Sequence, residues 1–421
     1  MDSDFRPPRR LKTNTIKKKP QAPKPSPASK EVIETIDLAA IKPMETGPPA
    51  KTKKVSLGNI KSNLRPKHWY NLTTEEQVVL LGGLCSILFV LIFASYTLFF
   101  KTAAAPAIVI EKKVKAAPKV VTAEAPLTGL QVDPALTKRP VTAVMIENSL
   151  DARPQSGLQD AGIVYEAIAE GGITRFVALF QDTRPQYVGP VRSLRPYYID
   201  FFTPWDASVA HVGGSPEALA QIRSSGKDLD QFFNSGAYWR QNTRVAPHNV
   251  YTSFDKLDAL NQSKGYTTSA PKSWPRLAQK PLAKPTAKSI NLNISSFYFN
   301  SHYDYDAASN SYMRSEGDKP HMVTSSSDDV GSAVQLHPKV VIAMVIGYGI
   351  EADGKHSEYS VNGSGPVYVF QDGGVTQGTW SKADRSSQFA FQDANGQPIK
   401  LEPGQTWLTA VGDASMVTYN P

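Results

Sequence analysis

Cysteine is almost absent from this sequence. The 421 residues contain one cysteine, Cys85, and it lies within a long apolar run. A single thiol cannot form a disulfide within the chain, and the residues beyond the run can supply neither a thiolate metal site nor a cysteine nucleophile. Folded regions after the run must therefore be stabilised by their hydrophobic cores rather than by disulfides.

Several motifs that mark a known chemistry are also absent. The chain has no HExxH metal-binding motif and no GxSxG nucleophile elbow, and its seven histidines are scattered without the spacing of a metal site. We therefore expect neither a metal ion nor a cofactor. Catalysis by an elbow serine has no support in the sequence.

A membrane span is the clearest feature that is present. Residues 78–100 form a run of 23 residues without a charge. A helix of this length crosses a hydrocarbon core of about 30 Å. The run begins far from the N-terminus and has no small-residue cleavage site close behind it, which disfavours a removed signal peptide.

Basic residues are concentrated before this run. Residues 1–68 contain 16 Lys or Arg against 6 Asp or Glu, whereas Lys101 stands alone just after the run. Positive flanks stay inside, so we expect a single-pass protein of the cell membrane with a cytoplasmic N-terminus and extracytoplasmic C-terminal domains. The basic clusters at 17–19 and 51–54 either hold anionic lipid of the inner leaflet or act only as a topology signal.

Positive charge is not in excess beyond the span. Lys and Arg are balanced by Asp and Glu in residues 101–421. Because nucleic-acid binding requires a basic surface, we expect none from the exported part.

Composition divides the chain into six regions. The regions are, in order, a disordered basic cytoplasmic tail (1–77), a transmembrane helix (78–100), an extended stalk (101–135), a mixed α/β module (136–267), a Pro/Lys-rich linker (268–287) and a β-rich, mostly antiparallel module (288–421). The expected fold class is therefore α+β.

Local patterns predict individual elements. The β-branched runs at 139–148 and 175–182 predict buried strands, and 157–172 predicts a turn followed by a strand or a short helix. Residues 207–226 predict a strand, a glycine turn and a capped helix. The QDGG stretch at 371–374 predicts a hairpin turn.

Two arginines in GPVRSLRPYYIDFF (189–202) form the first candidate site. The residue before a proline is extended, so Arg195 should lie directly before a helix whose free N–H groups favour an anion. Arg192 and Arg195 would bind a carboxylate or phosphate, with Tyr197 and Tyr198 as a stacking face. The alternative is that both arginines pair with internal acids and stabilise the fold.

The stretch HVGGSPEA (211–218) predicts a second strand-to-helix turn. Ser215 would cap the helix, Gly213 and Gly214 would let the backbone approach a ligand, and His211 would act as a general acid or base. The turn lacks the phosphate-binding patterns GxGxxG and GxxxxGK, which weakens the case for a phosphate site. For His211, the alternative to a catalytic role is a packed or hydrogen-bonded structural histidine.

Two carboxylates and a loop complete the candidates. Glu166 and Glu170 lie four residues apart, share a face in a helix or a strand, and could divide acid and base roles; pairing to arginine is the alternative. On the loop at 238–249, Arg240, Arg244 and His248 accompany two aromatic residues and either grip a sugar or planar anion or pin the loop.

Longer stretches of the sequence resemble one family. The stretches are VMIEN (144–148), ARPQSGL (152–158), VYEAIAEGGITRF (164–176), VGPVRSLRPYYID (188–200), HVGGSP (211–216), RVAPHN (244–249), YMRSEGDKPH (312–321), GSGPVYVFQDGGVTQGTWSK (363–382) and LEPGQTWL (401–408). They resemble the YerB-like family, whose N- and C-terminal modules are known as domain of unknown function 3048.

The resemblance covers roughly residues 136–421 and implies a cell-envelope location and a two-module architecture without an agreed activity. Many relatives are lipid-anchored through an N-terminal cysteine, whereas a transmembrane helix takes that role here. The acidic residue that usually follows the histidine of the C-terminal stretch is missing after His321.

Three functions follow as hypotheses. The first is an envelope protein that binds a cell-wall polymer or another anionic envelope ligand through the arginines of the first module. The second is an enzyme acting on a wall polymer, with Glu166 or Glu170 as acid or base and His211 or His248 assisting. The third is an assembly scaffold whose cytoplasmic tail recruits a partner.

Overall fold

A computed structural model of the chain describes residues 72–99, 121–326 and 332–421. The chain divides into two units, residues 1–113 and 114–421. The predictions for the basic tail and for most of the stalk fall outside the described residues.

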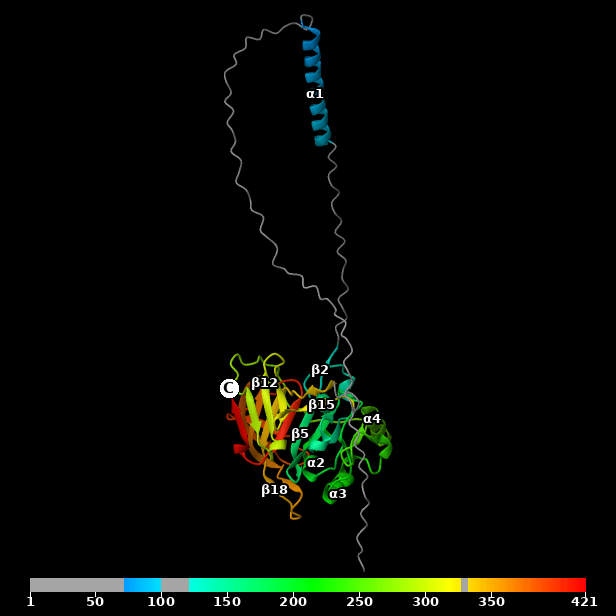
Figure 1. Ribbon diagram of the computed structural model, residues 1–421, viewed down its shortest axis with the longest axis vertical. Helices are drawn as coiled ribbons and strands as arrows, with labels where there is room; N and C mark the ends of the chain where they lie inside the picture. The colour runs from blue at the N-terminus through cyan, green and yellow to red at the C-terminus, as the bar shows by residue number, and fades with distance from the viewer. Residues whose placement is uncertain (1–71, 100–120, 327–331) are drawn as a thin grey trace, which may run out of the picture. The chain divides into compact units, whose positions relative to one another are not determined.

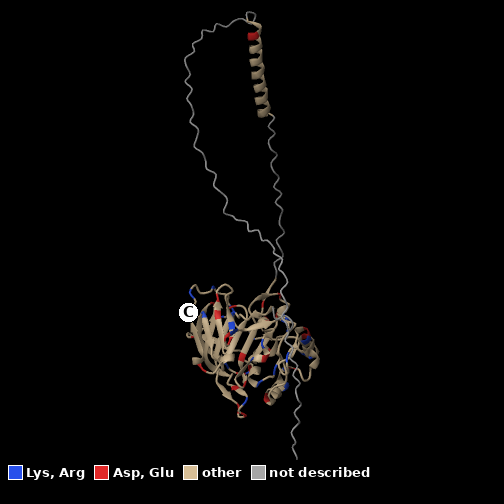
Figure 2. Ribbon diagram, viewed as in Figure 1, with Lys and Arg blue, Asp and Glu red and all other residues tan. Residues whose placement is uncertain are grey.

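The first unit contains helix α1 (Thr74–Phe99). The helix begins at a capping box, in which Thr73 Oγ1 accepts from the Glu76 N–H at 3.4 Å and Glu76 Oε2 accepts from the Thr73 N–H at 3.0 Å. No charge follows Glu76 in the helix, as Figure 2 shows, and none of its residues is buried. This 26-residue helix is long and apolar enough to cross a membrane, as the sequence predicts.

A ten-stranded sheet forms the centre of the second unit (Figure 1). Its strands are, in spatial order, β22 (Ala390–Asp393), β21 (Gly374–Lys382), β20 (Gly363–Gln371), β17 (Val340–Val345), β23 (Thr406–Val411), β5 (Ile163–Glu170), β6 (Ile173–Phe180), β3 (Thr142–Glu147), β7 (Ser208–His211) and β8 (Lys227–Asp230). Because β5 and β23 are parallel neighbours, strands from both predicted modules share one sheet. The module boundaries themselves stay a prediction.

Smaller sheets and, among the described residues, three α-helices complete this unit. The five-stranded sheet is formed by β14 (Lys319–Pro320), β13 (Ser311–Glu316), β12 (Ser301–Asp306), β11 (Ser289–Leu292) and β24 (Val417–Asn420). The small sheets are β16 (Val334–Gln335) with β15 (Met322–Thr324) and β4 (Gln155–Ser156), β9 (Tyr238–Arg240) with β10 (Val250–Thr252), β18 (Tyr348–Ile350) with β19 (Ser357–Tyr359), and β1 (Ala123–Glu124) with β2 (Gln131–Val132). The helices are α2 (Pro196–Phe202), α3 (Pro216–Ser225) and α4 (Phe254–Ser263).

Neighbouring residues of β5 show how the layers are arranged. Successive side chains of a strand point to opposite faces of the sheet. Tyr165 stacks on Phe201 of α2 with ring centroids 5.0 Å apart, whereas Glu166 binds Arg314 of β13. The large sheet is therefore covered by α2 on one face and by the five-stranded sheet on the other, which confirms the α+β class.

Local sequence signals fix several boundaries. The expected strand at 139–148 contains β3, the ambiguous segment at 157–172 contains strand β5, and the run at 175–182 overlaps β6, which ends at Phe180. Ser215 caps α3 by accepting from the Ala218 N–H at 3.3 Å. The β20–β21 hairpin turns at Asp372 and Gly373, both with positive φ (56° and 74°), as a two-residue hairpin turn requires.

The Pro/Lys-rich segment at 268–287 is attached to the folded unit at several points, and two side chains make the buried contacts. Trp274 is 5% exposed and donates its indole N–H to the Phe389 carbonyl at 2.7 Å. Arg276 donates to Thr406 Oγ1 and to the Glu402 carbonyl, both at 3.0 Å. This segment therefore contributes buried side chains to the folded unit.

Candidate functional site

The arginine before α2 is an internal ion-pair partner. Arg195 is extended (φ −126°, ψ 156°) at the N-cap of α2, as the sequence predicts. Its guanidinium is 8% exposed and pairs with Glu170, which also accepts from Arg175 at 2.9 Å. Helix α2 is only seven residues long, and the arginine at its N-cap is already paired with a carboxylate. These contacts therefore add no support for an anion at the start of this helix.

The other three groups of this candidate site are also engaged. Arg192 Nε lies 3.3 Å from Glu147 Oε1. Tyr197 and Tyr198 are buried, and their hydroxyls donate to the carbonyls of Ile168 at 2.6 Å and Arg175 at 2.8 Å. The tyrosine rings therefore form core rather than an exposed stacking face, and anion binding at 192–198 stays a prediction.

Glu170 makes stability depend on pH. Burial would raise its pKa, but the guanidiniums of Arg175 and Arg195 outweigh burial and lower the pKa from 4.5 to about 2. A depressed pKa gives stability that is present above the unfolded value and lost as pH falls towards 2. We expect Glu170→Gln to cost about 2 kcal/mol at neutral pH, after allowance for the partly exposed carboxylate, and to cost nothing near the lower pKa.

Denaturant unfolding of both proteins across this pH range measures the difference. Glu217→Gln, which alters an exposed glutamate on α3, is the matched control and should show no such convergence. A destabilisation by Glu170→Gln that stays constant from neutral to acid pH would contradict the ion-pair assignment.

The second predicted turn is filled by the chain itself. His211 is fully buried, with Nδ1 2.8 Å from the Gly213 carbonyl and Nε2 2.9 Å from Asp228 Oδ1. A Cβ at Gly213 would lie 2.8 Å from the ring of Phe232, and one at Gly214 would lie 2.8 Å from the carbonyl of Leu194. Groups of the protein therefore occupy the space beside both glycines. His211 is a packed, hydrogen-bonded histidine, which is the structural alternative given by the sequence analysis.

Glu166 and Glu170 do not act as a pair. The register of β5 shifts between Ile168 and Glu170, so the regular alternation of faces is interrupted there. Glu166 is fully buried and accepts from Arg314 at 2.9 and 3.0 Å and from the indole of Trp407 at 3.0 Å. The two carboxylates serve arginines on opposite faces of the sheet.

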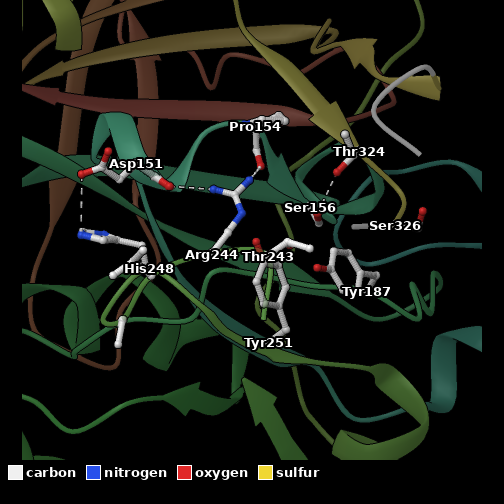
Figure 3. Close-up of a pocket in the computed structure, with 12 residues that line it drawn as sticks. Asp151, Pro154, Ser156, Tyr187, Thr243, Arg244, His248, Tyr251, Thr324 and Ser326 are labelled. Atoms are coloured by element: carbon white, nitrogen blue, oxygen red, sulfur yellow. Dashed lines mark hydrogen bonds and ion pairs between the residues drawn. The ribbon is translucent and has the colours of Figure 1, made fainter. Parts of the chain in front are cut away.

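Residues of the predicted loop meet at an open cavity of about 640 Å³ (Figure 3). Arg244 and His248 both line it, whereas Arg240 does not and instead donates to Asn249 Oδ1 at 2.7 Å. We call this cavity the Arg244 pocket. It lies between the 238–249 loop, the Asp151–Ser156 segment and the end of β15.

The charge of Arg244 has no acidic partner within the described ranges. Its guanidinium donates to the backbone carbonyls of Asp151 at 2.7 Å and Pro154 at 2.6 Å, and Figure 3 shows it held between these two residues. Two carbonyl contacts fix the fork without neutralising it, and a guanidinium carries five N–H donors. The pocket is therefore a place where a fixed positive charge meets solvent.

Aromatic rings and hydroxyls form the other walls. Tyr187 and Tyr251 stack with ring centroids 4.5 Å apart, and Trp239 lies 5.9 Å from Tyr187. Ser156 and Thr324 bring their hydroxyl oxygens within 3.1 Å of each other. Tyr251 is 1% exposed, so the ring that the pocket can offer to a ligand is the half-buried Tyr187. One partly exposed ring beside hydroxyls and a cation suits a ligand with both a ring and a negative charge.

His248 is oriented by a carboxylate. Its Nδ1 lies 2.8 Å from Glu147 Oε1, an oxygen that also accepts from Ser149 Oγ at 2.9 Å. Nε2 is left on the side of Asp151, another pocket residue, at 3.9 Å from Oδ2. This is the arrangement of an imidazole whose free nitrogen can exchange a proton with a bound group.

Most of the pocket lining was not predicted from the sequence, which singled out only Arg244 and His248 among these residues. Tyr187, Tyr251, Ser156 and Thr324 carry no motif of a known chemistry. Isolated bridges between Ser156 and Gly189 and between Val188 and Thr252 bring these segments together. Such pairings join residues far apart in the chain, so no local pattern announces them.

One group of side chains in the described ranges has the spacing of metal ligands. Glu351, Asp353 and His356 place their ligand atoms within 4.8 Å of one another on the β18–β19 hairpin. Asp353 and Lys355 at its tip are exposed, and His356 Nδ1 is already bonded to Asp353. The group gives no independent sign of a bound ion.

Comparisons with known proteins identify the family. The chain matches "Protein of unknown function (DUF3048) N-terminal domain" over residues 127–267 and the corresponding C-terminal domain over 290–408. It is 34% identical over 298 residues to "Putative lipoprotein YerB" of Bacillus subtilis (strain 168), which covers 69% of this chain and 86% of that protein. The chain belongs to the YerB-like family. The crystal structure of YerB from Bacillus subtilis has a TM-score of 0.62 at 30% identity, covering 71% of this chain and 100% of that one.

The Arg244 pocket uses both halves of the YerB-like sequence. Arg244 and His248 fall within the match to the N-terminal domain, and Thr324 falls within the match to the C-terminal domain. Neither family description names an activity or a ligand. The function must therefore be argued from the pocket itself.

Proposed function

We propose that this YerB-like protein is a single-pass envelope protein whose extracytoplasmic unit binds an anionic glycan or polyol polymer of the cell wall in the Arg244 pocket. The excess of basic residues before α1, against Lys101 alone in the ten residues that follow the apolar run, supports a cytoplasmic N-terminus. A relative that is described as a lipoprotein supports an envelope location.

One observation carries the binding proposal. Arg244 is held by two carbonyls, meets no acidic side chain in the described ranges, and stands beside the stacked rings of Tyr187 and Tyr251. The internal arginines Arg192 and Arg195, in contrast, are paired to buried or half-buried carboxylates. An anionic ligand would supply the acceptors that Arg244 lacks, while its sugar or polyol face would lie on the half-buried ring of Tyr187, which stacks on the buried Tyr251.

Retention of purified cell-wall fragments by the full chain in detergent micelles tests this proposal. Arg244→Ala should weaken retention roughly 10- to 100-fold, because a hydrogen bond to a charged group is worth about 1.5–3 kcal/mol. Arg244→Lys should restore part of the affinity, since it keeps the charge but loses the planar fork. Wall fragments stripped of their anionic polymers should bind wild type and Arg244→Ala equally weakly.

Arg240→Ala is the matched control, because Arg240 is an exposed arginine of the same loop that does not line the pocket. It should bind as wild type does. Equal retention of wild type, Arg240→Ala and Arg244→Ala, with unchanged unfolding midpoints, would overturn the proposal.

A hydrolase of the same polymer is the second candidate. The pairing of His248 Nδ1 with Glu147 favours it, because the imidazole would be a general base towards water in the pocket. Time-dependent release of soluble products from wall fragments, lost in His248→Ala while retention persists, would support this candidate. Absence of release leaves binding as the function. The scaffold hypothesis rests on a tail within residues 1–71, outside the described residues, and stays a prediction.

A further inference from the structure

A second cavity, of about 800 Å³, lies beside the Arg244 pocket and shares Pro154 with it. Its walls include Phe297, Tyr298 and Met322, and its lining reaches two buried polar side chains, Glu316 and His321. We call it the Glu316 cavity. Nothing in the family descriptions assigns it a role.

The two polar side chains have unmet hydrogen-bonding capacity. Glu316 is 4% exposed and His321 is 3% exposed, yet neither Glu316 Oε2 nor His321 Nδ1 makes a hydrogen bond. These atoms are 3.4 Å apart, and Oε2 also lies 3.1 Å from a guanidinium nitrogen of Arg153. Buried polar atoms without hydrogen bonds are costly, and a partner is therefore expected to meet them.

The partners of His321 define which nitrogen is the acceptor. Nε2 lies 2.9 Å from Gln155 Oε1. The Gln155 amide nitrogen donates to the Glu147 carbonyl and to Asn148 Oδ1, so its oxygen is the acceptor and His321 Nε2 carries the proton. In the neutral ring, Nδ1 is then an acceptor without a donor, 3.4 Å from Glu316 Oε2, on a residue that lines the cavity.

A ligand hydroxyl fits this pair. When Glu316 Oε2 carries a proton, a hydroxyl can accept from it and donate to His321 Nδ1; when Glu316 is ionised, the hydroxyl donates to one of the two acceptors. Burial raises the pKa of Glu316 and lowers the pKa of His321 well below its ordinary value, which opposes charge on both groups. At this pair, a neutral hydroxyl is therefore favoured over an ion, whereas Arg153, Asp318 and Lys319 elsewhere in the lining carry charges of both signs.

Exposed aromatic rings supply the second element of recognition. Phe297 is 56% exposed and Tyr298 is 54% exposed, with ring centroids 5.4 Å apart in an edge-to-face arrangement. Arg153 donates to the Tyr298 carbonyl at 2.9 Å and so holds this wall in position. Exposed rings beside a polar floor present an apolar surface to the C–H face of a sugar.

We propose that the Glu316 cavity binds the neutral ring of a sugar, with one ring hydroxyl bonded to Glu316 Oε2 and His321 Nδ1 and the apolar ring face on Phe297 and Tyr298. This site is separate from charge recognition at Arg244. It remains valid if the Arg244 pocket binds no anion.

Titration of the full chain with two neutral oligosaccharides, chitotetraose and cellotetraose, tests the site. The protein is kept in a zwitterionic detergent, which carries no sugar headgroup, and binding is followed by calorimetry. We expect wild type to bind at least one of them with a Kd of roughly 1 mM or tighter. The Phe297→Ala, Tyr298→Ala double variant should bind at least about tenfold more weakly, since one stacking face is lost.

Two controls separate this site from other effects. A Phe232→Ala, Phe233→Ala double variant removes two other exposed rings, 69% and 71% exposed, and should bind as wild type does. Arg244→Ala should also keep oligosaccharide binding. Glu316→Gln, which keeps the shape of the side chain, should weaken binding severalfold if it retains the wild-type unfolding midpoint.

Wild type that binds neither oligosaccharide would overturn the proposal. So would equal binding by wild type and the Phe297→Ala, Tyr298→Ala variant, whose exposed positions leave folding unaffected.

Discussion

Arg314→Ala is expected to lower the free energy of unfolding of the folded unit by about 4 kcal/mol or more, because it leaves buried carboxylates without their cation. Arg314 has no exposed surface and donates to Glu166 at 2.9 and 3.0 Å and to Glu316 at 2.9 Å. Its guanidinium also lies 4.4 Å from the centre of the Trp407 ring. The substitution would therefore leave the fully buried Glu166 carboxylate between the two sheets without a compensating positive charge.

Denaturant unfolding of the full chain measures this loss. Adding Glu166→Gln to Arg314→Ala should recover part of the lost free energy of unfolding, because the second change removes the uncompensated negative charge of Glu166. Arg314→Lys should fall between wild type and Arg314→Ala, since a lysine cannot reproduce the fork, which reaches both glutamates through one nitrogen and Ser301 Oγ through the other. A loss below about 1 kcal/mol for Arg314→Ala would show that this arginine does not hold the layers together.

Arg276→Ala is expected to cost about 3 kcal/mol, because several backbone and side-chain acceptors lose one shared donor. Arg276 lies in the Pro/Lys-rich segment and joins three parts of the fold, donating to the Leu127 carbonyl at 2.5 Å, to Thr406 Oγ1 and to the Glu402 carbonyl. Burial lowers its pKa to about 10, which leaves it charged at neutral pH.

The change should also expose residues 268–287 to proteolysis. Lys280→Ala, at an exposed position of the same segment, is the control and should leave both the unfolding midpoint and the cleavage rate unchanged. If Arg276→Ala were cleaved no faster than Lys280→Ala, the segment would be anchored by other contacts.

Local signals account for the elements that the sequence predicted well. Pro196 and Ser215 mark helix starts because a proline suits a first helical position and a serine side chain can cap free N–H groups. Asp372 and Gly373 mark a hairpin because both adopt positive φ. In each case the residue that carries the signal lies within a few positions of the element.

Which arginine lines a pocket depends on contacts between residues that are far apart in the sequence, and no local pattern predicts such contacts. The sequence favoured Arg192 and Arg195 because they precede a helix, but their partners Glu147 and Glu170 become neighbours only after the sheet forms. A bulge in β5 also separated Glu170 from Glu166. Arg244 had weaker local support, although among these arginines it is the one that keeps its charge unpaired in a cavity.

Photo-crosslinking of the full chain to anionic cell-wall fragments, followed by peptide mapping, shows where the ligand lies. We expect labels on the peptides that contain residues 151–156 and 239–251, and loss of these labels in Arg244→Ala. Labelling centred on residues 192–198, or labelling that Arg244→Ala leaves unchanged, would contradict it.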